Sequence, residues 1–240
     1  MRAIIPAILP KSREDLNDKL TRLSGITNEV QIDIVDGRFV SPASWPYLHD
    51  EKAGESVLSA GDQLPELDSF KFDIDLMVEE PEKEIGKWVR AGATRITVHA
   101  ETTRRLPELI QDFQVQYGHD KGFVPGLLSL GLALNIATDT SLIEPFLDNC
   151  DYIQFMGIAK IGKQGEPFDA RVIPKIHAFH RKYPDMPIQV DGGVSRNSAV
   201  KLLEAGASRL VIGSALWRAP DLKEEMDSFC NLLQTHGLYT

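Results

Sequence analysis

Two stretches far apart in the chain carry an aspartate at the end of an alternating polar and apolar pattern. The first is Val30-Gln31-Ile32-Asp33-Ile34-Val35-Asp36-Gly37, and the second is Ile188-Gln189-Val190-Asp191-Gly192-Gly193-Val194. An extended strand would place Gln31 and Asp33 on one face and the apolar residues on the other. Carboxylates that project inward at the rim of a parallel barrel can reach a substrate there. We predict that Asp33 and Asp191 face each other across one pocket and transfer protons.

The elements that must position these acids alternate along the chain between strand-like and helix-like patterns. Strands are expected over residues 3–9, 29–35, 70–78, 94–99, 128–135, 151–157, about 188–191, and 208–213. Helices are expected from Ser12 to Leu23, over a weakly patterned 51–60, from Pro81 to about Ala91, over 103–117, from Ser141, and over 169–182, 196–205 and 220–234. Strict alternation favours a parallel sheet.

The inner faces of these strands distinguish between two parallel architectures. Strands of an open doubly wound sheet read as uninterrupted apolar runs, because helices cover both of their faces. Here one face carries small or polar residues, as in Ser129, Gly131 and Ala133, or in Asp73, Asp75 and Met77. The pattern therefore favours a closed (β/α)8 TIM barrel. A length of 240 residues, close to the roughly 250 of such barrels, indicates one domain over residues 1–240.

Composition and charge narrow the class of protein and its partners. A net charge of −9 argues against nucleic acid or an anionic membrane as the main partner, while leaving room for a phosphorylated ligand bound by backbone amides. The two cysteines, Cys150 and Cys230, have no metal-like spacing and form no disulfide framework, which favours a reducing compartment. No stretch approaches the length of a membrane span. We expect a cytoplasmic protein.

A set of short motifs, in a fixed order, makes the chain resemble the ribulose-phosphate 3-epimerase family over nearly its whole length. The motifs are Asp33-Ile34-Val35-Asp36-Gly37 with Phe39-Val40, Leu76-Met77 with Glu80-Pro81, Ala91-Gly92-Ala93, Thr97-Val98-His99-Ala100-Glu101, Leu132-Ala133-Leu134-Asn135, Asp191-Gly192-Gly193-Val194 and Gly213-Ser214-Ala215. The resemblance implies a phosphate-binding barrel of the ribulose-phosphate type. It also implies an isomerase of carbohydrate metabolism, with a homo-oligomeric structure.

The mechanism implied by the resemblance uses two aspartates on opposite faces of a phosphorylated ketose. They correspond to Asp33 and Asp191, which would invert the carbon beside the ketone through an enediolate, as in the conversion of ribulose 5-phosphate to xylulose 5-phosphate. Inversion explains the need for two acids, because one proton leaves by one face and another returns by the opposite face. In the family both aspartates also hold a divalent metal, together with two histidines.

The chain departs from the family pattern at the metal site and in the pocket wall. The two histidines are replaced by Gln31 and Asp75, a serine on the first strand by Ala7, and one of three pocket methionines by Val35, while Met77 and Met156 are retained. The resulting metal ligands, Asp33, Asp75, Asp191 and Gln31, offer only oxygen, which favours Mg²⁺ or Mn²⁺ over Zn²⁺.

The replaced histidines also change the charge of the site. Three carboxylates and a divalent cation sum to −1, and without metal the carboxylates would repel and at least one pKa would rise. Arg38, Lys160 and Lys163 are candidates to offset that charge. The metal site is therefore expected to be altered, or absent.

The phosphate-binding side keeps more of the family pattern. Gly192-Gly193 and Gly213-Ser214 follow the last two strands, where barrels of this type bind phosphate through backbone N–H groups and a helix N-terminus. The loop 158–168 holds Gly162 and Gly165 at a spacing similar to that of the family's lid, with lysines that could contact phosphate.

Simpler interpretations remain open for several of these residues. Asp75 could be an acid paired with Arg38, Gln31 a hydrogen-bonding filler, and Met77 and Met156 barrel packing, while His99 is expected to be structural. Other functions are an epimerase of a six-carbon ketose phosphate and a sugar-phosphate-binding protein without catalysis. A sugar-phosphate decarboxylase is disfavoured because the chain lacks an Asp-x-Lys-x-x-Asp pattern.

Overall fold

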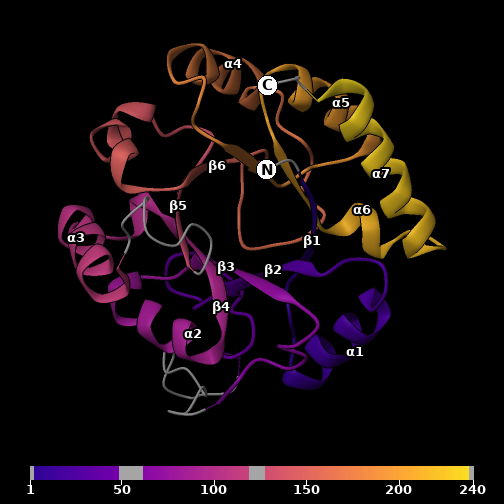
Figure 1. Cartoon of the computed structure of the whole chain (residues 1–240), viewed down its shortest axis with the longest axis horizontal. Helices are drawn as coiled ribbons and strands as arrows, with labels where there is room; N and C mark the ends of the chain where they lie inside the picture. Colours follow the sequence, from indigo (N-terminus) through magenta and orange to yellow (C-terminus); the bar gives the residue numbers. More distant parts are fainter. Residues whose placement is uncertain (1–2, 49–61, 119–127, 238–240) are drawn as a thin grey trace.

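Eight parallel strands close into a barrel in which each strand pairs with its neighbours in sequence order (Figure 1). The structure is a computed structural model that describes residues 3–48, 62–118 and 128–237. The strands are β1 (Ala3–Ile8), β2 (Glu29–Val35), β3 (Lys71–Met77), β4 (Ala93–His99), β5 (Ser129–Leu134), β6 (Tyr152–Met156), β7 (Ile188–Asp191) and β8 (Arg209–Ile212). The predicted (β/α)8 TIM barrel is confirmed.

Helices surround the barrel on its outside (Figure 1). The α-helices are α1 (Arg13–Leu23), α2 (Ile85–Ala91), α3 (Leu106–Tyr117), α4 (Val172–Lys182), α5 (Arg196–Glu204), α6 (Ser214–Trp217) and α7 (Leu222–His236). The 3₁₀ helices are η1 (Pro81–Lys83), η2 (Ala100–Thr102), η3 (Thr140–Leu142) and η4 (Glu144–Asn149). Within the described residues, none of these helices combines the length and the apolar character that crossing a membrane would require.

Proline accounts for two differences between the expected and observed helices. The helix expected over 103–117 begins at Leu106, with Pro107 in its first turn, the one place in a helix where a missing N–H costs nothing. The helix expected from Ser141 is instead two 3₁₀ helices, and Pro145 lies in the first turn of the second. The helix expected over 51–60 falls outside the described residues.

The two faces of each strand have different surroundings. On β2, Val30, Ile32 and Ile34 are completely buried in the main apolar core, which includes residues of the strands and of the helices around them. The opposite face carries Gln31 and Asp33 into the barrel interior. This alternation was predicted from the sequence, and it means that the interior holds most of the buried polar groups.

Strand register determines which inward residues share a level. Asp33 on β2 pairs with Asp75 on β3, and Met156 on β6 pairs with Asp191 on β7. Because all strands are parallel, the ends that carry these residues lie at the same rim. One level deeper, Gln31 pairs with Asp73.

A glycine on the inner face of β5 makes room for the largest side chain in the interior. A Cβ atom built on Gly131 would lie 2.2 Å from the ring of Tyr152 on the neighbouring strand β6. The Tyr152 ring therefore occupies the volume that a side chain at position 131 would need. It lies against the guanidinium of Arg95, which is 3.8 Å from the ring centroid.

Candidate active site

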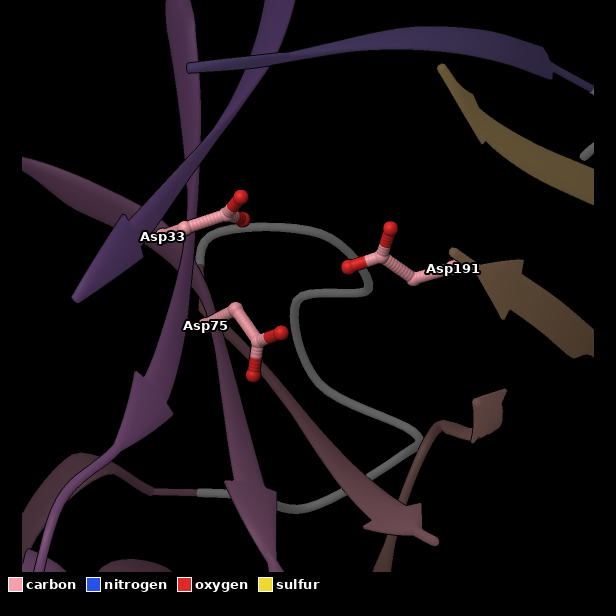
Figure 2. A group of neighbouring side chains, drawn as sticks. All are labelled: Asp33, Asp75 and Asp191. Carbon is pink, nitrogen blue, oxygen red and sulfur yellow. The ribbon is translucent and has the colours of Figure 1, made fainter. Parts of the chain in front are cut away.

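Three aspartates converge at the rim of the barrel from β2, β3 and β7 (Figure 2). Asp33 and Asp191 point toward each other from opposite sides, and Asp75 reaches into the space between them from below in this view. One carboxylate oxygen of each lies within 4.8 Å of the others. Asp75 is completely buried, whereas Asp33 and Asp191 keep 7% and 8% of their surface exposed toward a cavity.

The side-chain amide of Gln31 bridges Asp33 and Asp191. Its Nε2 donates to Asp33 Oδ1 at 2.9 Å and to Asp191 Oδ2 at 2.8 Å. Its Oε1 accepts a hydrogen bond from Gln189 Nε2 at 3.1 Å. Gln31 was predicted as a metal ligand through oxygen, but in the structure its nitrogen faces the two carboxylates.

Asp75 has two close partners that were not predicted for it. Gln154 Nε2 donates to its Oδ2 at 3.0 Å, and His99 Nε2 lies 3.2 Å from its Oδ1. Burial disfavours the charged form of His99, but nearby carboxylates, Asp75 first among them, more than offset this and raise the pKa of the imidazole. His99 therefore places an imidazole with a raised pKa next to Asp75.

The three cations expected to offset the negative charge of the aspartates, Arg38, Lys160 and Lys163, differ in their position relative to the cavity. Among the described residues, Lys163 is the cation that lines the cavity, and neither Arg38 nor Lys160 belongs to its lining. Arg95 Nε lies 3.2 Å from Asp73 Oδ2, so the guanidinium offsets a fourth buried aspartate one level below the other three.

Burial and mutual repulsion shift the pKa values of the two aspartates that face the cavity. Burial is the largest cause for Asp33 and raises its pKa well above the usual range, and repulsion from Asp191 and Asp75 adds to this. Burial and repulsion from Asp75 raise the pKa of Asp191 to about 7, although the hydrogen bond from Gln31 opposes them. Two such acids close together favour a state in which they hold a proton between them.

A cavity lies above the aspartates, and Asp33 and Asp191 belong to its lining. It is lined by all of the residues predicted to contact substrate or phosphate, namely Met77, Met156, Gly162, Gly165, Gly192, Gly193, Gly213 and Ser214. One wall is an apolar cluster that contains Val35, Met77, Met156, Ile158 and Ile161. The sequence-predicted residues thus come together around one space.

The loop 158–168 closes one side of this cavity. Gln164 on this loop donates from Nε2 to the backbone oxygen of Ala7 at 3.2 Å. Trp217 of α6 donates from Nε1 to the same oxygen at 2.7 Å. A Cβ atom on Gly193 would lie 2.6 Å from Cα of Phe168, so this glycine lets the end of the loop pack directly against β7's C-terminal turn.

Sequence reasoning did not predict the side-chain hydrogen bonds that Gln154, Gln189 and Arg209 make inside the barrel. Gln189 and Gln154 each precede a pocket residue by two positions, so period-two alternation already placed them on inner faces. The pattern could not indicate which strands across the barrel they contact.

Comparisons with known proteins converge on one family. The model described as the ribulose-phosphate 3 epimerase family matches residues 3–217. A ribulose-phosphate 3-epimerase from Schizosaccharomyces pombe is 29% identical over 95% of this chain and 92% of its own length. The enzyme of that name from Bacillus subtilis is 30% identical over 93% of this chain and 96% of its own length.

Solved structures with a similar fold have much lower sequence identity. The 3-keto-L-gulonate-6-phosphate decarboxylase from Vibrio cholerae is 10% identical, with a TM-score of 0.66 over 99% of this chain and all of that one. The 3-hexulose-6-phosphate synthase from Salmonella typhimurium is 14% identical, with a TM-score of 0.64 over 98% of this chain and all of that one. At these identities the likeness is one of fold.

The raised pKa of Asp191 predicts a pH dependence of stability. The folded-state pKa of about 7 exceeds the ordinary value of 3.8, so the native state binds more protons than the unfolded chain between these values. With metal chelated, the contribution of Asp191 to the free energy of unfolding should be largest below about pH 4 and should be lost as the pH rises to about 7.

Urea denaturation at several pH values measures this effect. Asp191→Asn should flatten the fall in the free energy of unfolding over that range. Asp169→Asn is the control, because hydrogen bonding by Arg171 lowers the pKa of this partly buried carboxyl, a shift of the opposite sign. An unchanged slope in Asp191→Asn would contradict the assigned shift.

Proposed function

The chain belongs to the ribulose-phosphate 3-epimerase family, and we propose on this premise that it epimerises ribulose 5-phosphate to xylulose 5-phosphate. The observation that carries the proposal is the pair Asp33 and Asp191, which reach toward each other from β2 and β7 below one cavity. The relatives named above are epimerases, so the family is one of isomerases.

The chemistry of inversion assigns a role to each carboxylate. One aspartate, ionised, removes the proton from the carbon beside the ketone, which leaves an enediolate. The other, protonated, returns a proton to the opposite face of the same carbon. The reverse reaction exchanges the two roles.

The electrostatics of the pair favour the required protonation. Both pKa values are raised, chiefly by burial, and repulsion from neighbouring carboxylates adds to this. A state with one proton for the pair is thereby favoured over the doubly ionised state, and it contains both a base and an acid.

The three aspartates fit a hard divalent cation. Asp33, Asp75 and Asp191 each offer a carboxylate oxygen, within 4.8 Å of one another, and oxygen ligands favour Mg²⁺ or Mn²⁺ over Zn²⁺. When bound, such a cation would supply positive charge beside the oxygens of the enediolate. The His99 imidazole next to Asp75 supplies a second positive group, which would bring the site's formal charge from −1 to zero when protonated.

The far side of the cavity suits the phosphate group. Gly192 and Gly193 follow β7, while Gly213 and Ser214 follow β8 at the start of α6. Backbone N–H groups at such turns bind phosphate in barrels of this type. Lys163 on the loop 158–168 adds a cation to the same lining.

A six-carbon ketose phosphate is the second candidate substrate. Ala7 and Val35 stand where the resemblance implies a serine and a methionine, and both are smaller. Ala7 lines the cavity, whereas Val35 is buried behind the lining residues Met77 and Met156. A longer sugar would use the space that the shorter side chain of Ala7 leaves.

Hydrogen exchange measures the proposed proton transfer directly. Incubation with ribulose 5-phosphate in deuterated water should place deuterium at carbon three. Asp33→Asn and Asp191→Asn should each lower the rate of conversion to xylulose 5-phosphate by about 10²–10⁴-fold, because inversion needs both proton-transfer groups. Asp169→Asn, outside the cavity, is the matched control.

Binding without exchange, with Mg²⁺, Mn²⁺, Co²⁺ or Zn²⁺ added, would favour a non-catalytic sugar-phosphate-binding protein. Exchange with a six-carbon ketose phosphate alone would favour the second substrate. Normal conversion to xylulose 5-phosphate in either asparagine variant would overturn the two-aspartate mechanism.

Metal content separates the proposed oxygen site from a zinc site. Elemental analysis and Mn²⁺ titration should find Mg²⁺ or Mn²⁺ bound, and Asp75→Asn should weaken Mn²⁺ binding by about tenfold or more, because it removes a charged ligand. Tightly held zinc at about one ion per chain would contradict the assigned metal preference.

Gly193 should matter more for substrate binding than for the rate of proton transfer. An added methyl group would collide with Phe168 and displace the loop beside the phosphate side of the cavity. Gly193→Ala should therefore raise KM for the sugar phosphate by about tenfold, which corresponds to roughly 1.4 kcal/mol of lost binding.

Gly25→Ala is a matched control for this change. Gly25 has a φ of +74°, close to the +66° of Gly193, but nothing lies within 4 Å of its added Cβ. Both substitutions therefore strain the backbone, whereas only one disturbs the cavity. Equal KM values in the two variants would contradict a role of the turn at Gly193 in phosphate binding.

A further inference from the structure

We propose that Arg209, deep in the barrel interior, sets the orientation of the amides of Gln189, Gln31 and Gln154, so that the N–H donors of Gln31 and Gln154 face the three aspartates. The inference deepens the proposed function and rests on it, because it assigns Arg209, Gln189 and Gln31 as positioning residues for the proton-transfer pair. Arg209 and Gln189 donate their hydrogen bonds to other residues than Asp33 and Asp191, and they act on this pair through Gln31.

The chain of hydrogen bonds begins at a group that can only donate. The guanidinium of Arg209 is 5% exposed, and an ion pair with Glu29 holds it in place. Its Nε donates to Gln189 Oε1 at 2.8 Å. Because a guanidinium has no acceptor, Gln189 must present its oxygen to Arg209 and its NH₂ group to the other side.

The NH₂ group of Gln189 transmits this orientation to two further amides. Its Nε2 lies 3.1 Å from Gln31 Oε1 and 2.8 Å from Gln154 Oε1. Asp73 Oδ2, at 3.2 Å, is a third acceptor for the same nitrogen. Gln31 and Gln154 therefore both turn their oxygens inward to Gln189.

The nitrogens of these two amides consequently point at the rim. Gln31 Nε2 donates to both Asp33 and Asp191, and Gln154 Nε2 donates to Asp75. Each aspartate receives one N–H, from an amide whose reversal would break the bonds to Gln189. Reversal would also bring a carbonyl oxygen against a carboxylate, an arrangement with no hydrogen to share.

This arrangement affects both the proton-transfer pair and the metal site. One amide bonded to Asp33 and to Asp191 fixes the two carboxylates relative to each other, as a reaction that uses opposite faces of one carbon requires. The same orientation holds Gln31 Oε1 away from the aspartates, so the metal ligands are carboxylates alone.

Substitutions at Arg209 test whether this residue sets the orientation of the glutamine amides. Arg209→Lys keeps a group that can only donate, whereas Arg209→Met has similar bulk and no donor. The methionine is combined with Glu29→Gln so that no partly buried carboxylate is left without its cation. The matched control is Arg196→Met with Glu225→Gln, which removes an ion pair at the protein surface.

The first measurement is the side-chain amide spectrum of protein labelled with ¹⁵N. The Gln31 NH₂ signal is identified by its loss in Gln31→Glu. It should be retained in Arg209→Lys and in the control, and should shift or split in the methionine variant, whose amides can reverse. Mn²⁺ titration is the second measurement, and the methionine variant should bind about tenfold more tightly, because Gln31 can then add its oxygen.

The third measurement is exchange with ribulose 5-phosphate, in which the methionine variant should lose at least about tenfold in kcat with KM unchanged. An unaltered Gln31 signal in that variant, or equal changes in the lysine and methionine variants, would overturn the orienting role. If the wild-type protein shows no exchange but the variants show the expected change in the amide signals, the proposed function is contradicted and the orienting role of Arg209 is supported.

Discussion

The interior of this barrel depends on one requirement, that every buried carboxylate must receive hydrogen-bond donors. A buried carboxylate without partners costs several kcal/mol, and four aspartates lie in the interior and at its rim. Asp73 receives a hydrogen bond from Arg95, Asp75 receives one from Gln154, and Asp33 and Asp191 share the amide of Gln31, while the His99 ring lies beside the other oxygen of Asp75. The polar inner faces of the strands are therefore a connected network, and the reactive pair is its outermost part.

Position 31, where the family resemblance implies a metal-binding histidine, has a different chemical role in this chain. A neutral imidazole bound to a metal supplies a lone pair, whereas the Gln31 amide in this structure supplies two hydrogens. The nearest imidazole now belongs to His99, which contacts Asp75. Departures from the family pattern are thus part of one rearranged set of interactions, in which positive charge and N–H donors lie around three carboxylates.

Much of the fold and the site could be predicted from the sequence, because strand alternation is a local property. It placed Gln31, Asp33, Asp75, Met156 and Asp191 on inner faces, and parallel connections bring strand ends to one rim. Contacts across the barrel could not be predicted in this way, because they depend on strand register and tilt. Arg38, Lys160 and Lys163 were expected to offset the acidic charge; the structure places Lys163 in the cavity lining, and Arg95 and His99 of β4 beside Asp73 and Asp75.

Substitutions at Gly131 and Tyr152 are coupled, because a side chain at position 131 and the Tyr152 ring would occupy the same volume inside the barrel. The Tyr152 ring fills the space where a side chain at 131 would project, and its hydroxyl lies 2.7 Å from Thr97 Oγ1. Neither residue can be exchanged freely while the other stays. Among descendants of a common ancestor, an absent side chain on the fifth strand and an aromatic one on the sixth should be inherited together, and should diverge together.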